Sequence, residues 1–169
     1  MSSPPSSARS AAAAARVWRL GADIDTDALA PGHAMKHGLD VIARACLESV
    51  RPDFAGGVQP GDVIVAGPNF GIGSSREQAA AALRHLGVAA VIAPSFAGLF
   101  FRNAFNLGLL LLTCPGCEAI AEGERIGFDA RAGGAVLATE PIPGFLLDMV
   151  EAGGLLPQLQ RRFQARTTP

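Results

Sequence analysis

Cysteine is scarce in this chain of 169 residues, and its scarcity excludes two classes of protein. The chain has only Cys46, Cys114 and Cys117, and an odd number of cysteines argues against a framework of disulfide bonds. An iron–sulfur cluster needs about three or four cysteine ligands, often close together in the sequence, and this chain does not offer that set. We therefore expect no metal and no other cofactor held by this chain itself.

The pair Cys114 and Cys117 has the spacing CxxC, which allows more than one interpretation. There is no second such pair and no nearby histidine, so half of a metal site is disfavoured. We interpret the pair as a reduced, structural turn at the end of a strand. The alternative is a redox pair, which predicts that replacement of Cys117 has the largest effect on function.

Strong charge and long apolar segments are also absent. Fourteen lysines and arginines against fifteen aspartates and glutamates give a net charge of −1. This balance excludes a basic nucleic-acid surface and a polybasic membrane patch. No segment approaches the roughly 20 apolar residues that a membrane-spanning helix needs. With 49% hydrophobic residues, the composition is typical of a soluble globular protein. We expect a cytoplasmic protein without nucleic-acid or membrane partners.

Residues 1–15 differ in composition from the rest of the chain. They are mainly serine, alanine and proline, with Arg9 as the only charged side chain, and cannot bury enough apolar surface to become ordered. We expect a disordered leader over 1–15 and one domain over 16–165. The leader also resembles a transit peptide, although no clear amphipathic pattern supports import.

Apolar runs and helical patterns alternate along the rest of the chain. This order predicts a βαβαβ unit and an α/β fold with a largely parallel central sheet, right-handed crossovers and flanking helices. Ligands of such sheets bind beyond the carboxyl ends of the strands. The expected strands are 17–20, 63–66, 87–93, 109–112, 125–129 and 135–139, and the expected helices are 39–50, a segment from 74 to 86, 96–106, 145–151 and 155–163.

The stretch 63–86 contains the main candidate site. A buried strand leads into a glycine-rich loop and then into helix formers, with Ser74, Ser75 and Arg76 where the helix is expected to begin. The unpaired N–H groups of a helix N-terminus favour a small anion, and the guanidinium of Arg76 can bind a carboxylate or phosphate through two hydrogen bonds. We therefore predict an anion site here.

A structural alternative stays open for the same serines. Ser74 with Glu77, or Ser75 with Gln78, has the spacing of a capping box, which stabilises a helix by about 1 kcal/mol. Two serines and Arg76 in one turn are more than a single cap requires. Nucleotide binding is disfavoured, because a Walker A motif needs a lysine before its serine, and Lys36 is the only lysine.

The residues from Asn69 to Ala79, NFGIGSSREQA, resemble the signature of the aconitase family's swivelling domain. The similarity is specifically to the free-standing small subunits of 3-isopropylmalate dehydratase and their relatives. It continues through the segments APSFA and FRNA and extends from about Val17 to Leu156. Gly98 stands where the family usually has an arginine, so one cationic contact is missing.

The resemblance implies an aconitase-type swivelling β/β/α domain and a hydro-lyase that acts on a hydroxy di- or tricarboxylic acid in leucine biosynthesis. It implies that Ser74 is the catalytic base, that Ser75 and Arg76 hold a substrate carboxylate, and that Asn69 and Gly73 help to bind substrate. It also implies a large partner subunit with a [4Fe–4S] cluster, without which this chain is inactive.

The segment 21–38 is expected beside this site. By the same resemblance, Thr26 and Asp27 match a family segment next to the active site and are candidate substrate-binding residues. Ala22 and Asp23 depart from the usual Asp-Asn of that segment. The loop after Pro31 selects the substrate's side group in the family. Its usual sequence is absent here, so His33, Met35 and Lys36 are candidate contacts to an unusual substrate, with a solvated loop as the alternative. The calcium interpretation of the alternating aspartates fails because the required glycine and glutamate are missing.

Two further hypotheses remain. Within the same class, the altered loop favours a relative that acts on homocitrate, 2,3-dimethylmalate or methylmalate. From another class, the chain is a non-catalytic anion-binding or regulatory module in which Ser74 only caps a helix.

Overall fold

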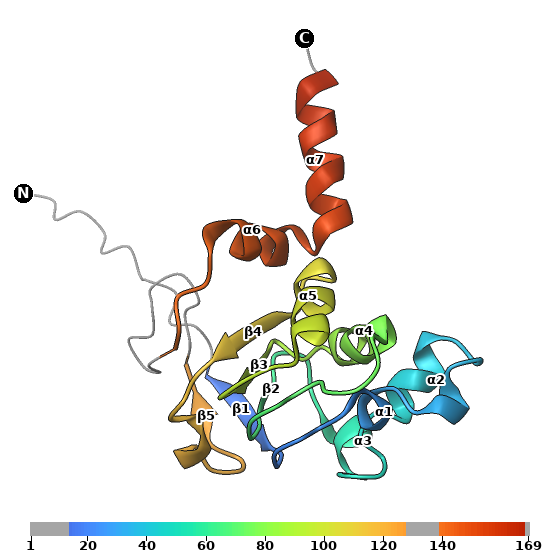
Figure 1. Cartoon of the computed structure of the whole chain (residues 1–169), viewed down its shortest axis with the longest axis vertical. Helices are drawn as coiled ribbons and strands as arrows, with labels where there is room; N and C mark the ends of the chain where they lie inside the picture. The colour runs from blue at the N-terminus through green and yellow to red at the C-terminus, as the bar shows by residue number, and fades with distance from the viewer. Residues whose placement is uncertain (1–13, 128–138, 168–169) are drawn as a thin grey trace, which may run out of the picture.

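The computed structural model describes residues 14–127 and 139–167, whose centre is a five-stranded sheet in the order β4-β3-β2-β1-β5 (Figure 1). Strands β1 to β4 pair in parallel, and β5 is antiparallel to β1. The prediction of a largely parallel sheet flanked by helices is confirmed. The strands are β1 (Ala15–Arg19), β2 (Val63–Val65), β3 (Ala90–Ala93), β4 (Leu110–Thr113) and β5 (Arg125–Ile126).

Helices connect the parallel strands in the predicted order. The central unit runs β2-α4-β3-α5-β4, which confirms the βαβαβ interpretation. Helix α4 contacts α1, α2 and α5, and α5 in turn contacts α6 and α7, so the helices form one connected layer. The helical segments are α1 (Thr26–Leu29), η1 (Gly32–Ala34), α2 (Leu39–Arg44), α3 (Phe54–Gly57), α4 (Glu77–His85), α5 (Gly98–Asn106), η2 (Cys117–Ala119), α6 (Gly144–Ala152) and α7 (Leu155–Thr167).

The sheet is buried on both faces, as the short apolar runs predicted. Every residue of β2 and β3 is buried. Trp18 of β1 packs edge-on against Phe54 of α3, with 5.2 Å between the ring centroids. The face of the sheet that carries Trp18 and its partner Ile64 on β2 is therefore the one that faces α3. On β4, Leu110, Leu111 and Leu112 are all at most 6% exposed.

The CxxC pair covers part of the sheet. Cys114 and Cys117 are buried and free, and the Cys117 thiol donates a weak hydrogen bond to the Ala66 carbonyl at 3.7 Å. Burial first, and the neighbouring Cys114 second, raise the pKa of the Cys117 thiol to about 11. A thiol that stays protonated is a poor nucleophile, which supports the structural interpretation over the redox one. Burial likewise raises the pKa of Cys46 to about 12.

Several predicted boundaries were wrong. Helix α4 begins at Glu77 and not at Ser74, and α2 ends at Arg44, after which turns replace the helix expected up to residue 50. Strand β1 begins at Ala15, within the expected leader, and β5 is only two residues long. Residues 135–138 of the last expected strand, and residues 1–13 of the leader, lie outside the described residues.

The C-terminal helices differ in their packing. Helix α6 buries Leu147 and Met149 against the body, whereas α7 has no buried residue and projects away from it (Figure 1). Leu146 and Val150 are half-buried against the core, so the apolar side chains of α6 pack on the body. The described helices include none with the length and apolar character to span a membrane.

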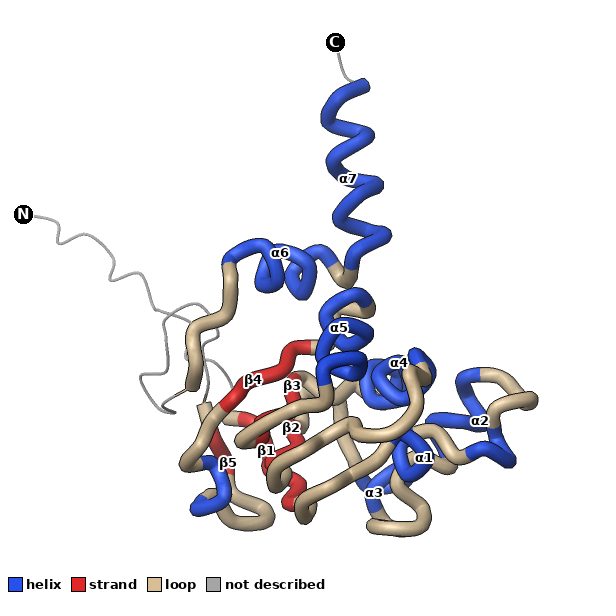
Figure 2. Tube along the Cα trace, viewed as in Figure 1, coloured by secondary structure: helices blue, strands red, loops and turns tan. Residues whose placement is uncertain are grey.

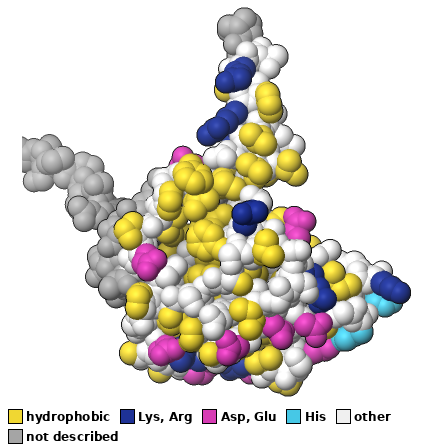
Figure 3. All heavy atoms as spheres, in the orientation of Figure 1, with side chains coloured by type: hydrophobic (Ala, Val, Ile, Leu, Met, Phe, Trp, Pro, Cys, Tyr) yellow, Lys and Arg dark blue, Asp and Glu magenta, His cyan; other side chains and the backbone are white. Residues whose placement is uncertain are grey.

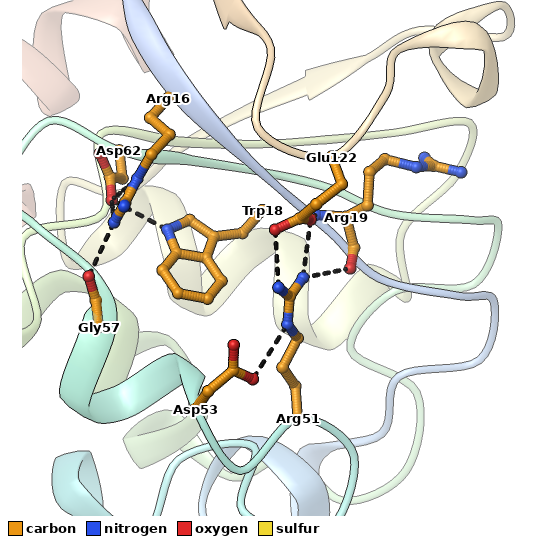
Figure 4. Close-up of polar contacts among 8 residues, drawn as sticks. All are labelled: Arg16, Trp18, Arg19, Arg51, Asp53, Gly57, Asp62 and Glu122. Carbon is orange, nitrogen blue, oxygen red and sulfur yellow. Dashed lines mark hydrogen bonds and ion pairs between the residues drawn. The ribbon is translucent and has the colours of Figure 1, made fainter.

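A polar cluster fixes β1 to its neighbours (Figure 4). The buried Asp62 carboxylate accepts hydrogen bonds from Arg16, from the indole N–H of Trp18 at 2.9 Å and from the backbone N–H of Gln59 at 2.9 Å. Burial opposes ionisation of this group. The three donors outweigh it and hold the pKa of Asp62 below its ordinary value of 3.8.

The guanidinium of Arg51 extends this cluster to the far end of β1. It binds both carboxylate oxygens of Glu122 at 2.6 and 2.7 Å and donates to the Arg19 carbonyl at 3.1 Å. The paired guanidinium lowers the pKa of Glu122. Arg16 and Arg51 also lie over the ring of Trp18, with 4.9 and 4.6 Å from guanidinium carbon to ring centroid.

Asp62→Ala is expected to lower the free energy of unfolding by about 2–3 kcal/mol at pH 7, because buried donors lose a charged acceptor. The folded-state pKa of Asp62 is depressed, so its contribution is present above the unfolded value and disappears as the pH falls through the folded value. The difference between variant and wild type therefore narrows in acid. Urea unfolding across pH measures it, with Asp53→Ala, an exposed partner of Arg51, as the matched control. If the difference in the free energy of unfolding between Asp62→Ala and wild type stays the same in acid, the ionised carboxylate of Asp62 is not its source.

Candidate functional site

The candidate site lies at the carboxyl edge of the sheet, where three loops meet (Figure 2). The aspartate loop (residues 21–31) follows β1, the serine loop (residues 67–76) follows β2, and residues 94–97 follow β3. Short parallel bridges join Asp25 to Ile72 and Phe70 to Phe96. The edge predicted for ligand binding is therefore built from segments that are distant in the sequence.

Glycines fix the backbone of the serine loop. Gly71 has a φ of +84°, and a Cβ there would lie 2.2 Å from the Phe100 ring. Gly73 has a φ of +112°, and a Cβ would come within 3.0 Å of the Thr26 hydroxyl oxygen. Any other residue at position 71 would collide with α5, so the loop's path depends on glycine.

Ser74 and Ser75 are exposed at the tip of this loop. The backbone N–H of Ser74 donates to the hydroxyl of Thr26 at 3.0 Å, and Thr26 is only 2% exposed. The two side-chain hydroxyls make no hydrogen bond within residues 14–127 and 139–167. Thr26 thus positions the backbone at Ser74 and leaves the serine hydroxyl free to act on a ligand.

The serines do not cap helix α4. The residue that precedes the helix is Arg76, in an extended conformation, and no side chain accepts a capping hydrogen bond there. The capping-box alternative is therefore wrong for this loop. The N–H groups of residues 75–78 have no hydrogen-bond partner in the described part of the chain, and they lie at the positive end of the helix dipole. This is the arrangement that favours a bound anion.

Arg76 bridges the serine loop and the aspartate loop. Its guanidinium donates to the Ala30 carbonyl at 2.6 Å and to the Asp27 carboxylate at 3.2 Å. Its side chain is 22% exposed, whereas Asp27 is 73% exposed. Both bonds use the same terminal nitrogen, so the remaining donors of the guanidinium are left for a ligand.

Asn69 anchors the other end of the serine loop. Its side chain donates to Asp23 at 2.9 Å, and its backbone N–H donates to the Ser95 hydroxyl at 2.9 Å. Asn69 and Asp23 both have left-handed backbones, with φ of 63° and 58°. Such conformations in side-chain-bearing residues persist only where the surroundings hold them. Asn69 therefore shapes the loop, and its amide is occupied by Asp23.

The three aspartates of the aspartate loop have separate partners. Asp23 accepts from Asn69, Asp25 accepts the Ala28 N–H at 2.7 Å and so caps α1, and Asp27 pairs with Arg76. The described residues contain no group of three or more histidine, cysteine, aspartate or glutamate side chains that is able to hold a metal.

The loop after Pro31 is only partly connected to this site. His33 is exposed and pairs with Glu48, and Met35 is half-buried against the core. Lys36 is exposed and makes no ion pair within the described residues. A shallow hollow lined by Asp27, Pro31, Gly32, His33, Glu48 and Ser49 adjoins Arg76's partner Asp27. His33 lies at this hollow, whereas neither Met35 nor Lys36 lines it.

Two contributors were missing from the predicted site. Ser95, which fixes Asn69, lies in the segment APSFA, and the Ala30 carbonyl, which binds Arg76, carries no side-chain signal at all. Asn103 of α5 donates to the Ser75 carbonyl at 3.4 Å, so α5 also supports the loop. Ser95 was in a segment already singled out, whereas a main-chain acceptor is visible only in three dimensions.

The fold and the sequence of this chain match a known class of domain. Residues 56–116 match the family model described as the aconitase C-terminal domain. The solved structure of a 3-isopropylmalate dehydratase from Methanocaldococcus jannaschii is similar with a TM-score of 0.82 and 35% identity, over 90% of this chain and 96% of that chain.

Similar curated proteins define the family more narrowly. The isopropylmalate/citramalate isomerase small subunit of Methanocaldococcus jannaschii is 40% identical over 87% of this chain and 93% of that protein. The 3-isopropylmalate dehydratase small subunit 1 of Methanopyrus kandleri is 43% identical over 86% and 91%. The homoaconitase small subunit of Methanothermobacter thermautotrophicus is 43% identical over 83% and 86%. This chain belongs to the family of 3-isopropylmalate dehydratase small subunits.

Ser74→Ala is expected to leave the free energy of unfolding within about 0.5 kcal/mol of wild type, because the hydroxyl is exposed and makes no hydrogen bond among the residues that the structure describes. Thr26→Val is the positive control. It removes the acceptor of the Ser74 N–H at a buried position and is expected to cost about 1–2 kcal/mol. Urea unfolding followed by circular dichroism measures both. A loss of about 1 kcal/mol or more in Ser74→Ala would mean that the serine stabilises the fold after all.

Proposed function

We propose that this chain is the small subunit of a 3-isopropylmalate dehydratase-type hydro-lyase, which removes water from a hydroxy di- or tricarboxylic acid and adds it back. The observation that carries the proposal is the pairing of an exposed, unbonded Ser74 with Arg76 and four free N–H groups at the start of α4. Family membership supports the same reaction, since the relatives carry the names of such small subunits.

Dehydration of a hydroxy acid has three chemical requirements. A base must accept a carbon-bound proton, a Lewis acid must assist the departing hydroxyl, and cations or N–H donors must hold the carboxylates. Ser74 is proposed as the base, with its hydroxyl ionised to accept that proton. A [4Fe–4S] cluster in the large subunit supplies Lewis acidity for the hydroxyl. No residue of this chain is proposed as a ligand of that cluster.

Serine is a weak base unless its surroundings favour the ionised form. The free N–H groups of residues 75–78 and the dipole of α4 supply fixed positive potential next to Ser74. The guanidinium of Arg76, two residues along the same loop, adds positive charge that Asp27 offsets only in part. These groups are in place before substrate binds, so they need no rearrangement when negative charge develops.

The substrate carboxylate is proposed to bind between Arg76 and the N–H groups of the serine loop, with the Ser75 hydroxyl as a further donor. Asp27 neutralises part of the charge of Arg76 and holds its guanidinium at one nitrogen. Asp27 is itself anionic and disfavours direct contact with a carboxylate. Its proposed role is therefore to position Arg76, together with the Ala30 carbonyl.

The substrate is proposed to be 3-isopropylmalate, in the pathway to leucine. Relatives of comparable identity are named for isopropylmalate with citramalate and for homoaconitase, so related acids remain candidates. Homocitrate, 2,3-dimethylmalate and methylmalate are the alternatives favoured by the unusual loop after Pro31. Of the loop's candidate contacts, His33 lines the hollow beside Asp27 and is the best placed to meet a substrate side group.

The reaction is tested with the chain and its large subunit assembled under anaerobic conditions, by following the absorbance of the enoate product from a panel of hydroxy acids. The expected result is turnover of 3-isopropylmalate, lowered about 10²–10⁴-fold in Ser74→Ala while the complex stays assembled. Asp53→Ala, at an exposed carboxylate that pairs with Arg51 outside the site loops, serves as the control. Turnover of another malate alone overturns the leucine assignment, and a near-normal rate in Ser74→Ala supports the non-catalytic module.

Arg76→Lys is expected to raise KM for the substrate at least tenfold, equivalent to about 1.4 kcal/mol, because an ammonium lacks the planar pair of donors. The measurement is initial rate against substrate concentration in the assembled enzyme. Arg44→Lys on α2, an exposed arginine outside the site, is the matched control. An unchanged KM would remove Arg76 from the carboxylate site.

A further inference from the structure

Helix α7 buries none of its 13 residues in the chain that carries it. It projects from the body, and its contacts are with α5 and α6 (Figure 1). Leu155, Leu159 and Phe163 are spaced at four-residue intervals and so lie on one face of the helix. Phe163 is 65% exposed and Leu156 is 71% exposed. A helix of this length is marginal in water by itself, so an apolar face left open indicates a surface that another element covers.

An apolar groove adjoins this helix. It consists of two neighbouring hollows of about 530 and 570 Å³ that share Leu155, one against α4 and one between α5 and α6. Figure 3 shows hydrophobic side chains gathered at the base of the projecting helix, where the surface is hollowed. Phe145 of α6, which is 62% exposed, lines the second hollow. Exposed apolar side chains that gather around a hollow, as they do on this face, are typical of an interaction site.

The charge around the groove argues against a second copy as its occupant. Helix α7 carries Arg161, Arg162 and Arg166, and the sequence has no acidic residue after Glu151. Arg84 and Arg102 line the two hollows. Two copies that paired through α7 would bring like charges together, which opposes association. A partner with an apolar ridge flanked by acidic residues is complementary to the groove.

The groove is continuous with the candidate active site through α5. Arg102 lines the second hollow, and the next residue, Asn103, donates to the carbonyl of Ser75 in the serine loop. Glu77, the first residue of α4, lines the first hollow and directly follows Arg76. A partner that covers the serine loop therefore reaches the groove without leaving the same face of α4 and α5.

We propose that α7 and the groove at its base dock an acidic, apolar-faced helix of the large subunit. This inference rests on the proposed function, because it takes the large subunit as the partner. The apolar side chains supply affinity, and the arginines of α7 supply orientation and a salt-dependent association rate.

The test measures the dissociation constant between the full chain and the reconstituted large subunit by analytical ultracentrifugation under anaerobic conditions. The double variants Leu156→Ser with Phe163→Ser, and Arg161→Glu with Arg162→Glu, are each expected to weaken binding at least tenfold. All four side chains are exposed, so folding is preserved, and thermal unfolding checks this. At saturating small subunit, kcat is expected to stay within twofold of wild type, since none of the four contacts the serine loop. The matched control is Val50→Ser with Arg44→Glu, exposed positions in and after α2.

Each result decides between the two proposals. Weaker binding of the α7 variants with unchanged control binding supports the docking site. If the α7 variants bind the large subunit with wild-type affinity, the docking site is overturned. The proposed function still holds in that case, provided that the complex is active. Variants that alter only self-association of the isolated chain also overturn it, in favour of a second copy. A wild-type chain that binds no large subunit overturns both.

Discussion

The hydrogen bond from the Ser74 N–H to the Thr26 hydroxyl holds together two loops that lie almost fifty residues apart in the sequence. Each loop follows a different strand, so the bond fixes the two loops to each other at one edge of the sheet. It is flanked by the backbone bond from Thr26 to the Ile72 carbonyl at 2.8 Å and by the ion pair of Arg76 with Asp27. Because Thr26 is buried, its two hydrogen bonds are shielded from competing water, whereas the ion pair of Arg76 with Asp27 lies at the surface. The exposed Ser74 hydroxyl is therefore presented from a rigid support, which is what positioning of a reactive group requires.

Much of the fold was predictable because local and tertiary signals agree. The apolar runs at β2, β3 and β4 are buried on both faces, and the segments between them have helical patterns that match α4 and α5. The start of α4 was not predictable, because Ser74 and Ser75 have cap-like spacing that tertiary contacts override. Gly73 has a left-handed backbone and the next N–H, that of Ser74, is bonded to the Thr26 hydroxyl, so the helix begins only at Glu77. The shortened α2 has a similar cause, since Leu47 takes a φ of 62° and hydrogen-bonds back to Ala28.

The candidate site was likewise predictable only in part. Ser74, Ser75, Arg76 and Thr26 were identified from their motifs, and contacts recorded in the structure bring them together. The position of Asp27 followed from the resemblance, but its ion pair with Arg76 depends on the approach of two loops. The Ala30 carbonyl and the Ser95 hydroxyl act through the backbone path, which no residue pattern specifies. Lys36 is the opposite case, because it stays a predicted substrate contact while its exposed side chain makes no ion pair within the described residues.

Under the proposed function, the exposure of Ser74 gives a physical reason for a site completed by a second chain. A serine hydroxyl in open water gives up its proton far too rarely to act as a base, and the field of the α4 N-terminus is weakened by solvent and salt. When a partner surface excludes water from the same edge, the effective dielectric falls, and the N–H groups and Arg76 act on Ser74 with greater strength. In the proposed reaction, association would therefore do more than deliver a Lewis acid, because it would also strengthen the electrostatic action of groups that this chain already holds in place. Control of the proposed reaction by assembly would follow from the exposure of the serine loop in the free subunit.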